Sequence, residues 1–593
     1  MKYAAQPDRP TIYVPAYYGV EAGREEPAVP GCMMVISHED IYGWKASFEE
    51  LERVLSSLPA EGLLIAIAKL NALLFWHSYT NPAVQRGLVA ELVDSPVKEQ
   101  VLRSLRAPNQ IALFEEQLLG LAKEAVLFGK QSGDLDLTES WNEVIRAAFL
   151  TSELLTGEHP VGGDFESDFT PMVVRSLYFN RFEAPSNLLA RYSDLLVSRP
   201  YKQGHRESPN WVDTKALFRA ATGLDLEDYL AAGFALVAHF GRFRNARDLE
   251  EYPFQVAWDD LKVTLPDPQA SERFIKNVAR PVTELSSEFR SMASKSQLAG
   301  ASLLPFFKTP VVLLKSGNLV PVSLSMLVDK LTNGVYWTLH EHMRKQGSQS
   351  LLRFTAFVGE LFQAQVFDLL DHSYQESTLL AKRLFGDISY GRPELRGADA
   401  TLFYDDTVIF FEVVSSRLRY RDTVLLGDLV ALDQDIDKCI VDKARQLDRV
   451  IRDFRAGRLV LNEIDSARIT HAIPVIVLLE PFPLFPLTWR RINRRLHEEG
   501  YLSNSQPLRV ISAEELERVE PLLETGHTFR SLLVGWTKDV EYSELSLKNF
   551  LLARFPTAPF RGSQMENLYD KFRQLVNERL TLEGEARPSI DPS

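Results

Sequence analysis

The chain has very little cysteine and no long uninterrupted apolar run. Its 593 residues include 2 cysteines, Cys32 and Cys439, which lie too far apart to indicate a disulfide framework or a cysteine zinc site. The most apolar stretch, 62–76, is interrupted by Lys69 and Asn71 and is short for a membrane span. The N-terminal residues carry early charges and prolines, unlike a signal peptide. We therefore expect a soluble cytoplasmic protein that does not associate with membranes.

The chain also lacks an excess of basic residues and the common nucleotide-binding and hydrolase motifs. Lys and Arg number 66 against 80 Asp and Glu, so the net charge is -14 and the isoelectric point is near 5.4. This balance argues against a broad electrostatic coating of nucleic acid, but it is compatible with a local basic channel. No Walker loop, dinucleotide-binding glycine fingerprint or nucleophile elbow occurs in the sequence.

The length and the globular composition, 45% hydrophobic and 25% charged residues, predict about two to four domains. Apolar residues at helical spacing dominate the first half of the chain, whereas helices and strands alternate from about Leu352 to Leu479. We divide the chain into an irregular or β-rich lead-in (1–45), a helical domain (46–300), a connector with a β-hairpin and a helix (301–345), an α/β domain (346–485) and a helical C-terminal extension (486–593).

Two carboxylates in the α/β region carry the strongest functional signal. Asp399 stands at the start of one short predicted strand, and Glu412 lies deep in the next, which is strongly apolar. Asp405 and Asp406 form a tight connection between the strands, so the two acids are expected to meet at one end of a hairpin. A carboxylate in such an apolar strand needs a metal, an arginine or a proton to offset its desolvation. Paired carboxylates can hold a divalent cation.

Two predicted helices flank these strands and carry further polar residues. Glu360 lies at the edge of the apolar stripe of the helix that precedes them. In the helix that follows, Asp435–Phe454, Lys443 falls inside the apolar stripe and Gln446 lies at its border. A lysine on an apolar face either extends its ammonium group to solvent or meets an acid. Purely structural roles are also open for these residues. Glu360 and Gln446 would then be solvated, Asp399 would be a turn residue, and Glu412 would be neutralised by an arginine.

This order of elements, a helix with Glu360, a strand with Asp399, a strand with Glu412 and a helix with Gln446, resembles the PD-(D/E)xK nuclease superfamily. The resemblance covers roughly residues 345–480. It implies a restriction-endonuclease-like α/β domain with a mixed central sheet, beside a mainly helical N-terminal region and a helical C-terminal extension. It also implies that Asp399, Glu412 and Glu360 bind Mg²⁺ or Mn²⁺ and that Gln446 belongs to the catalytic group.

The sequence departs from the family pattern at Val414, which stands where the family has a catalytic lysine two residues after the glutamate. Lys443 is our candidate for a lysine that has moved to a neighbouring element. The resemblance then predicts a metal-dependent endonuclease that hydrolyses phosphodiester bonds in DNA, or RNA, with a role in bacterial antiviral defence or nucleic-acid processing. The alternative is a catalytically inactive domain that serves as a nucleic-acid-binding or protein-interaction scaffold.

Two arginine clusters are candidates for contacting nucleic acid, with DNA favoured over RNA. The members of the first cluster follow the second strand at alternate positions, which share a face if the segment is extended. The members of the second cluster are spaced as on one face of a helix. Either face could contact phosphates. A solvated edge, or pairing with Glu498 and Glu499, is the competing interpretation. The helical N-terminal region is the expected site for a homo-oligomer or a partner protein. The candidate arginines are Arg417, Arg419, Arg421, Arg490 and Arg494.

Overall fold

The computed structural model describes most of residues 34–582. The residues outside the description are 1–33, 78–81, 107–109, 132, 134–136, 158–169, 172, 176, 179–184, 242–253, 262, 268, 294–302, 377–382, 392–394, 462–463 and 583–593. Most of the expected lead-in, 1–45, therefore lies outside the described residues. The described chain is mostly helical, with small two- and three-stranded sheets and one mixed five-stranded sheet, as predicted at this level. Within the described residues, no helix combines the length and the apolar character needed to cross a membrane.

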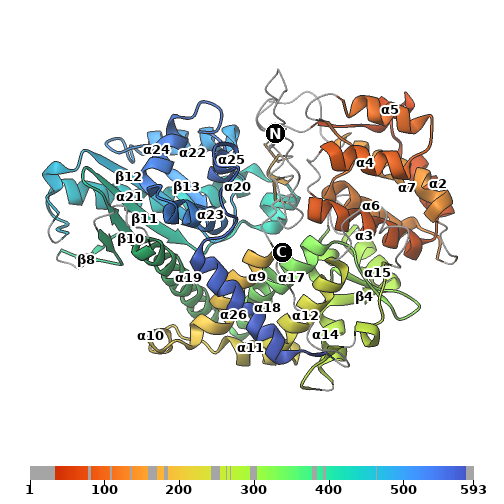
Figure 1. The fold of residues 1–593 in the computed structure, drawn as a ribbon, viewed down its shortest axis with the longest axis horizontal. Helices are drawn as coiled ribbons and strands as arrows, with labels where there is room; N and C mark the ends of the chain where they lie inside the picture. Colours follow the sequence, from red (N-terminus) through yellow and green to blue (C-terminus); the bar gives the residue numbers. More distant parts are fainter. Residues whose placement is uncertain are drawn as a thin grey trace.

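The N-terminal helices form one lobe, drawn in orange in Figure 1. The helix α3 (Ala60–His77) contains the most apolar stretch of the sequence, and most of its described side chains are buried. It packs against α6 (Glu115–Phe128), most of whose residues are buried, its polar residues included. The other main helices of this lobe are α2 (Phe48–Ser57), α4 (Pro82–Leu92), α5 (Val97–Ser104) and α7 (Leu137–Gly157).

A second group of helices connects this lobe to the five-stranded sheet (Figure 1). It includes the predicted hairpin, in which β5 (Val311–Leu313) pairs antiparallel with β6 (Leu319–Pro321). The strand β4 (Ala279–Pro281), which the sequence pattern did not predict, adds to β5 in parallel. The helices of this group are α9 (Pro185–Ser193), α11 (Thr214–Thr222), α12 (Leu226–Gly241), α14 (Ala270–Val278), α15 (Val282–Ala293), α17 (Leu324–Leu331) and α18 (Asn333–Gln346).

The five-stranded sheet has the order β13-β12-β11-β10-β7. The strand β10 runs antiparallel to both of its neighbours, β7 and β11, whereas β11, β12 and β13 run parallel to one another. The central strand β11 is buried along nearly its whole length because its sequence is apolar on both faces. The bounds are β7 (Arg383–Phe385), β10 (Ala400–Phe403), β11 (Thr407–Val414), β12 (His471–Leu478) and β13 (Arg509–Ser512).

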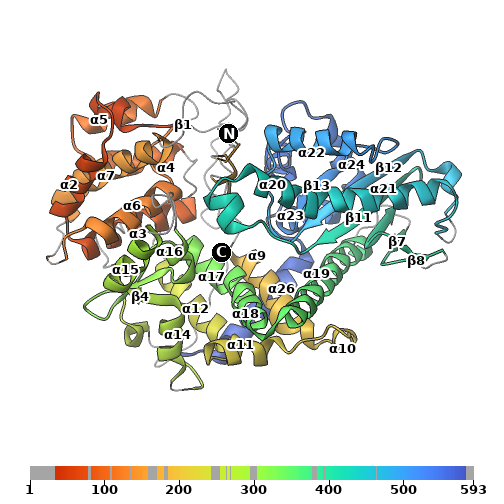
Figure 2. The same ribbon diagram turned by 180° about the vertical axis from the view of Figure 1, so that it is seen from behind.

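Helices cover both faces of this sheet. Phe411 faces α19 (Ser348–Glu376) and contacts Phe529 of α24 (Phe529–Lys538), with ring centroids 5.4 Å apart. Phe410 faces the opposite layer and contacts Phe454 of α21 at 5.6 Å. Successive residues of β11 therefore face opposite layers, as the geometry of a strand requires. Figure 2 shows α20 (Leu429–Ile436), α21 (Asp442–Arg455) and α22 (Pro486–Glu498) in front of the sheet.

The predicted boundary at residue 485 does not separate the sheet from a helical extension. The strand β13 pairs with β12, so the sheet continues into the region 486–593. The local sequence of this strand does not indicate which sheet it joins, and only the tertiary fold shows it. The chain then continues through α23 (Ala513–Glu524), α25 (Leu547–Arg554) and α26 (Ser563–Arg579). The helices α23 and α26 pack against α19, α26 also packs against α9, and α25 contacts α23.

A buried ion pair links the connecting helices to the sheet layer. Arg191 of α9 donates to both carboxylate oxygens of Glu517 on α23, at 2.6 and 2.8 Å, and the two side chains are 1% and 4% exposed. Removing one partner of a buried pair leaves an uncompensated charge in a medium of low polarity.

We predict that Arg191→Ala lowers the free energy of unfolding by about 3–5 kcal/mol. The matched control is Lys276→Ala, which removes an exposed pair with Glu272 and should cost less than about 1 kcal/mol. Urea unfolding followed by circular dichroism measures both. A cost for Arg191→Ala as small as that of the control would contradict a structural role for the buried pair.

Candidate active site

The hairpin of β10 and β11 brings Asp399 next to Glu412. Asp399 directly precedes β10, whose first residue, Ala400, is paired with Phe411. The Oδ2 atom of Asp399 accepts a hydrogen bond of 2.7 Å from the backbone N–H of Val413. Glu412 is fully buried, and Asp399 is 5% exposed. The two carboxylates are therefore neighbours at one end of the hairpin, as the sequence predicts.

The helix α21 supplies two side chains to Glu412. Gln446 donates from Nε2 to Oε1 of Glu412 at 2.6 Å, and Lys443 donates from Nζ to Oε2 at 3.3 Å. The buried residues Ala444 and Leu447 hold this helix on the sheet, and the spacing of three residues directs Lys443 and Gln446 to the same place. The structure therefore brings together four of the five residues predicted to be catalytic.

Arg396 is a further member of the group that the sequence did not single out. Its Nη2 atom donates to Oδ1 of Asp399 at 3.1 Å and to Oε1 of Gln363 at 2.9 Å, and its Nε atom donates to Asp387. The side chain is 54% exposed. An arginine three residues before an aspartate in a loop carries no pattern that distinguishes it from any surface arginine.

Burial and mutual repulsion make both carboxylates reluctant to ionise. Burial raises the pKa of Asp399 above its usual value, and the backbone N–H of Val413 opposes this. Burial and the neighbouring charge of Asp399 together raise the pKa of Glu412 to about 8, although Lys443 opposes the rise. The cations present therefore do not fully neutralise the pair, which is the electrostatic condition that favours a bound divalent cation.

Val414 lies on the same face of β11 as Glu412 and belongs to the apolar core beneath α21. It is 4% exposed. A lysine here would need room for a charged side chain inside this core, whereas Lys443 approaches from the helix above and remains 31% exposed. The packing thus accounts for a valine at this position.

Glu360 is held away from the other two acids. Its carboxylate accepts hydrogen bonds from Ser208 at 2.6 Å and Asn210 at 2.7 Å. The helix α19, which carries it, packs on the sheet face opposite to the side chain of Glu412. Within the described part of the chain, Glu360 does not join Asp399 and Glu412 in a group of three ligand atoms within 4.8 Å of one another. In this structure the expected third metal ligand instead fixes a loop.

The described arginines of the first cluster form ion pairs within the protein. Arg417 is ion-paired with Glu480, and its guanidinium lies 3.5 Å from the centre of the Tyr336 ring. Its side chain is 3% exposed, so it offers no surface for a phosphate. Arg419 pairs with Asp435 at 3.0 Å. The alternation predicted for an extended segment therefore directs these residues inward or into local pairs. The side chain of Arg421 lies outside the description.

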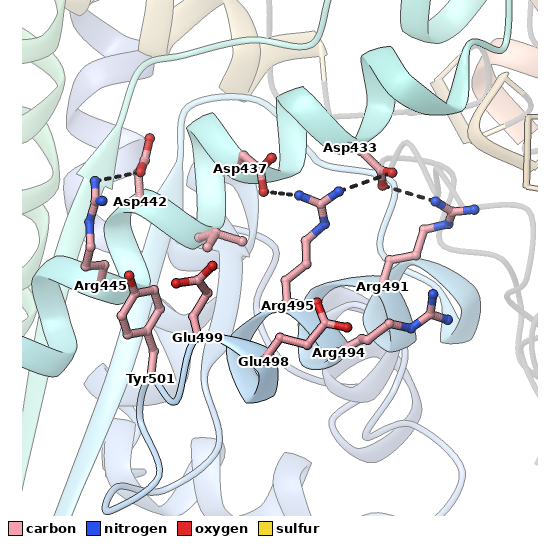
Figure 3. Close-up of a pocket in the computed structure, with 11 residues that line it drawn as sticks. Asp433, Asp437, Asp442, Arg445, Arg491, Arg494, Arg495, Glu498, Glu499 and Tyr501 are labelled. Atoms are coloured by element: carbon pink, nitrogen blue, oxygen red, sulfur yellow. Dashed lines mark hydrogen bonds and ion pairs between the residues drawn. The ribbon is translucent and has the colours of Figure 1, made fainter.

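The second cluster lies on α22, where Arg490 and Arg494 are exposed as predicted. Arg494 lines a cavity of about 620 Å³ between α22 and the helices α20 and α21 (Figure 3). Arg495 and Arg491 both form ion pairs with Asp433 in this cavity, at 3.1 and 3.0 Å. The surface therefore carries both signs of charge, which weakens the case for phosphate contact.

No protein-family model and no curated protein matches this chain. The functional argument therefore rests on the geometry of Asp399, Glu412, Lys443 and Gln446 and on the fold that positions them.

We predict that Glu412→Gln stabilises the protein in EDTA at alkaline pH. Because the pKa of Glu412 is near 8 in the folded protein and its ordinary value is 4.5, the folded state alone binds this proton between those values. Stability then falls by about 1.4 kcal/mol per pH unit as the pH rises through this range, and a glutamine avoids the loss.

Thermal unfolding of both proteins at several pH values between 5 and about 8.5 tests this. The advantage of the variant should grow with pH, whereas Glu498→Gln, at an exposed position on α22, should show no such trend. A constant difference across the range would show that Glu412 ionises normally.

Proposed function

We propose that this protein is a metal-dependent phosphodiesterase, an endonuclease with a restriction-endonuclease-like domain built on the five-stranded sheet. The observation that carries the proposal is the meeting of Asp399 and Glu412 with Lys443 and Gln446. The order of elements adds support. The helix α19, the strands β10 and β11, the helix α21 and the strand β12 follow one another as the resemblance to the PD-(D/E)xK superfamily implies.

The donor set fits a hard divalent cation such as Mg²⁺ or Mn²⁺. Asp399 and Glu412 offer carboxylate oxygens, each with a second lone pair beyond its present hydrogen bond. When bound, such a cation activates water and stabilises negative charge on a phosphate. Water or the substrate itself would complete the coordination, because Glu360 is held elsewhere.

Lys443 and Gln446 have separate tasks in this proposal. Gln446 fixes the orientation of the Glu412 carboxylate through a short hydrogen bond and also lies 3.4 Å from the carbonyl oxygen of Gly397. The ammonium group of Lys443 is partly exposed beside Glu412 and can offset charge that develops on the phosphate. It thus takes the place of the lysine that Val414 cannot supply.

Nucleic acid, DNA in preference to RNA, is the substrate that this chemistry suits best. Its binding would rely on the local cations Arg396 and Lys443, because the overall charge is negative. We also propose a cytoplasmic location and a role in antiviral defence or nucleic-acid processing, by analogy at the level of the fold. The helical lobe would then bind a partner protein or a second copy of the chain.

The second candidate is a catalytically inactive nuclease-like scaffold. A specific observation favours it, because each carboxylate oxygen of Asp399 and Glu412 already accepts a hydrogen bond from the protein. A closed polar network of this kind can be structural. The two candidates differ in whether a divalent cation binds these acids.

We predict that the protein cleaves DNA only with Mg²⁺ or Mn²⁺ and that Asp399→Asn and Glu412→Gln abolish cleavage. Lys443→Ala should reduce the rate by about 10²–10³-fold, because it removes charge stabilisation in the transition state. Lys438→Ala, at an exposed position just before α21, is the matched control and should retain the rate.

The assay uses plasmid, linear duplex, single-stranded DNA and RNA, each with EDTA, Mg²⁺ or Mn²⁺. Thermal unfolding with Mn²⁺ provides a readout that does not depend on turnover. Absence of cleavage on every substrate, together with an unfolding temperature that Mn²⁺ leaves unchanged, would favour the scaffold.

A further inference from the structure

A second cluster of metal-ligating side chains lies apart from the candidate active site, where three helices meet. His372 comes from the last turns of α19, and Glu520 and Glu524 come from the end of α23. One ligand atom of each residue lies within 4.8 Å of the others. Within the described residues, these three side chains form a group of potential metal ligands. The N-terminus of α26 closes the site, since the Ser563 hydroxyl lies 2.7 Å from Nε2 of His372.

The charges at this position are not balanced by cationic side chains. Among the described residues, no lysine or arginine forms an ion pair with Glu520 or Glu524. Glu520 is fully buried and has the carboxylate of Glu524 close by, so its negative charge is both desolvated and repelled. The ends of α19 and α23 add the partial negative charge of two helix C-termini. Both features disfavour two carboxylates at this place unless a cation is present.

The N-terminus of α26 offsets only part of this negative charge. Its backbone N–H groups donate to the acids, from Ser563 to Glu524 at 2.8 Å and from Gln564 to Glu520 at 2.6 Å. The other oxygen of Glu520 receives only a long contact, 3.4 Å, from the N–H of Met565, although the side chain is fully buried. This oxygen therefore lacks a normal hydrogen bond and retains lone pairs for a metal.

We propose that His372, Glu520 and Glu524 form a structural binding site for a divalent metal ion of the zinc class. One imidazole nitrogen and two carboxylate oxygens suit Zn²⁺ better than Mg²⁺, which prefers oxygen ligands alone. The Ser563 hydroxyl, 2.6 Å from Glu524 and next to His372, or a water molecule is placed to complete a tetrahedral set.

The backbone N–H groups of α26 then act as outer partners that orient the metal-binding carboxylates. Small side-chain rotations bring ligand atoms that lie within 4.8 Å of one another to the bond lengths of about 2 Å that Zn²⁺ requires. Such a site would tie α26 to α19 and α23, both of which contact α26. It is independent of the proposed nuclease function, since α23 and α19 lie on the sheet face opposite to Glu412.

Isothermal titration of the full chain with ZnCl₂ tests this proposal. We expect one Zn²⁺ per chain in the wild type, and His372→Ala should weaken the affinity by at least about tenfold, since even outer partners of metal sites matter this much. His497→Ala, at an exposed histidine on α22, is the matched control and should bind as the wild type does. The double variant Asp399→Asn, Glu412→Gln should also keep this Zn²⁺.

A second readout is the unfolding temperature, which Zn²⁺ should raise in the wild type and not in His372→Ala. Glu524→Gln provides an independent variant, because the glutamine removes the charge but keeps an oxygen that can accept the N–H of Ser563 at the start of α26. Equal affinity of the wild type and His372→Ala would overturn the site. Zn²⁺ binding that disappears in the Asp399, Glu412 double variant would overturn it as well and would assign the metal to the candidate active site.

Discussion

The position of Glu412 inside the sheet is the constraint on which the rest of the site depends. Its strand is apolar on both faces and is paired on both edges, so its carboxylate cannot reach solvent. An isolated charge in such a place would cost several kcal/mol. Lys443 and Gln446 meet this need by donating to the carboxylate, whereas the neighbouring Asp399 adds a like charge that increases it.

The same constraint explains which parts of the site could be predicted from the sequence. Strand alternation determines the face that Glu412 occupies, and a helix that must cover this face can present Lys443 and Gln446 only toward the strand. Local periodicity is enough for this inference. The position of Glu360 depends on a loop more than one hundred residues away, which supplies Ser208 and Asn210, and no local pattern contains that information.

The arginines illustrate the same limit. The alternate spacing of Arg417 and Arg419 predicts a shared face only if the segment is extended. Instead Arg417 meets Glu480, which is distant in sequence, and Arg419 meets Asp435 of the following helix. Similarly, no local pattern in β13 indicates that it pairs with β12 and so extends the sheet. Composition and periodicity thus predict elements and their buried faces, whereas ion pairs between distant elements depend on the complete fold.

Two acidic sites of opposite character therefore flank one sheet. Near Glu412, lysine and arginine already provide positive charge, and the hard cation that we propose would have to share the carboxylates with them. At Glu520, an imidazole and helix N–H groups replace the cationic side chains, and two helix C-termini add negative charge. The first arrangement suits a cation that arrives with a phosphate substrate and leaves with it. The second suits an ion that stays, because its ligands come from helices that the rest of the fold already holds together.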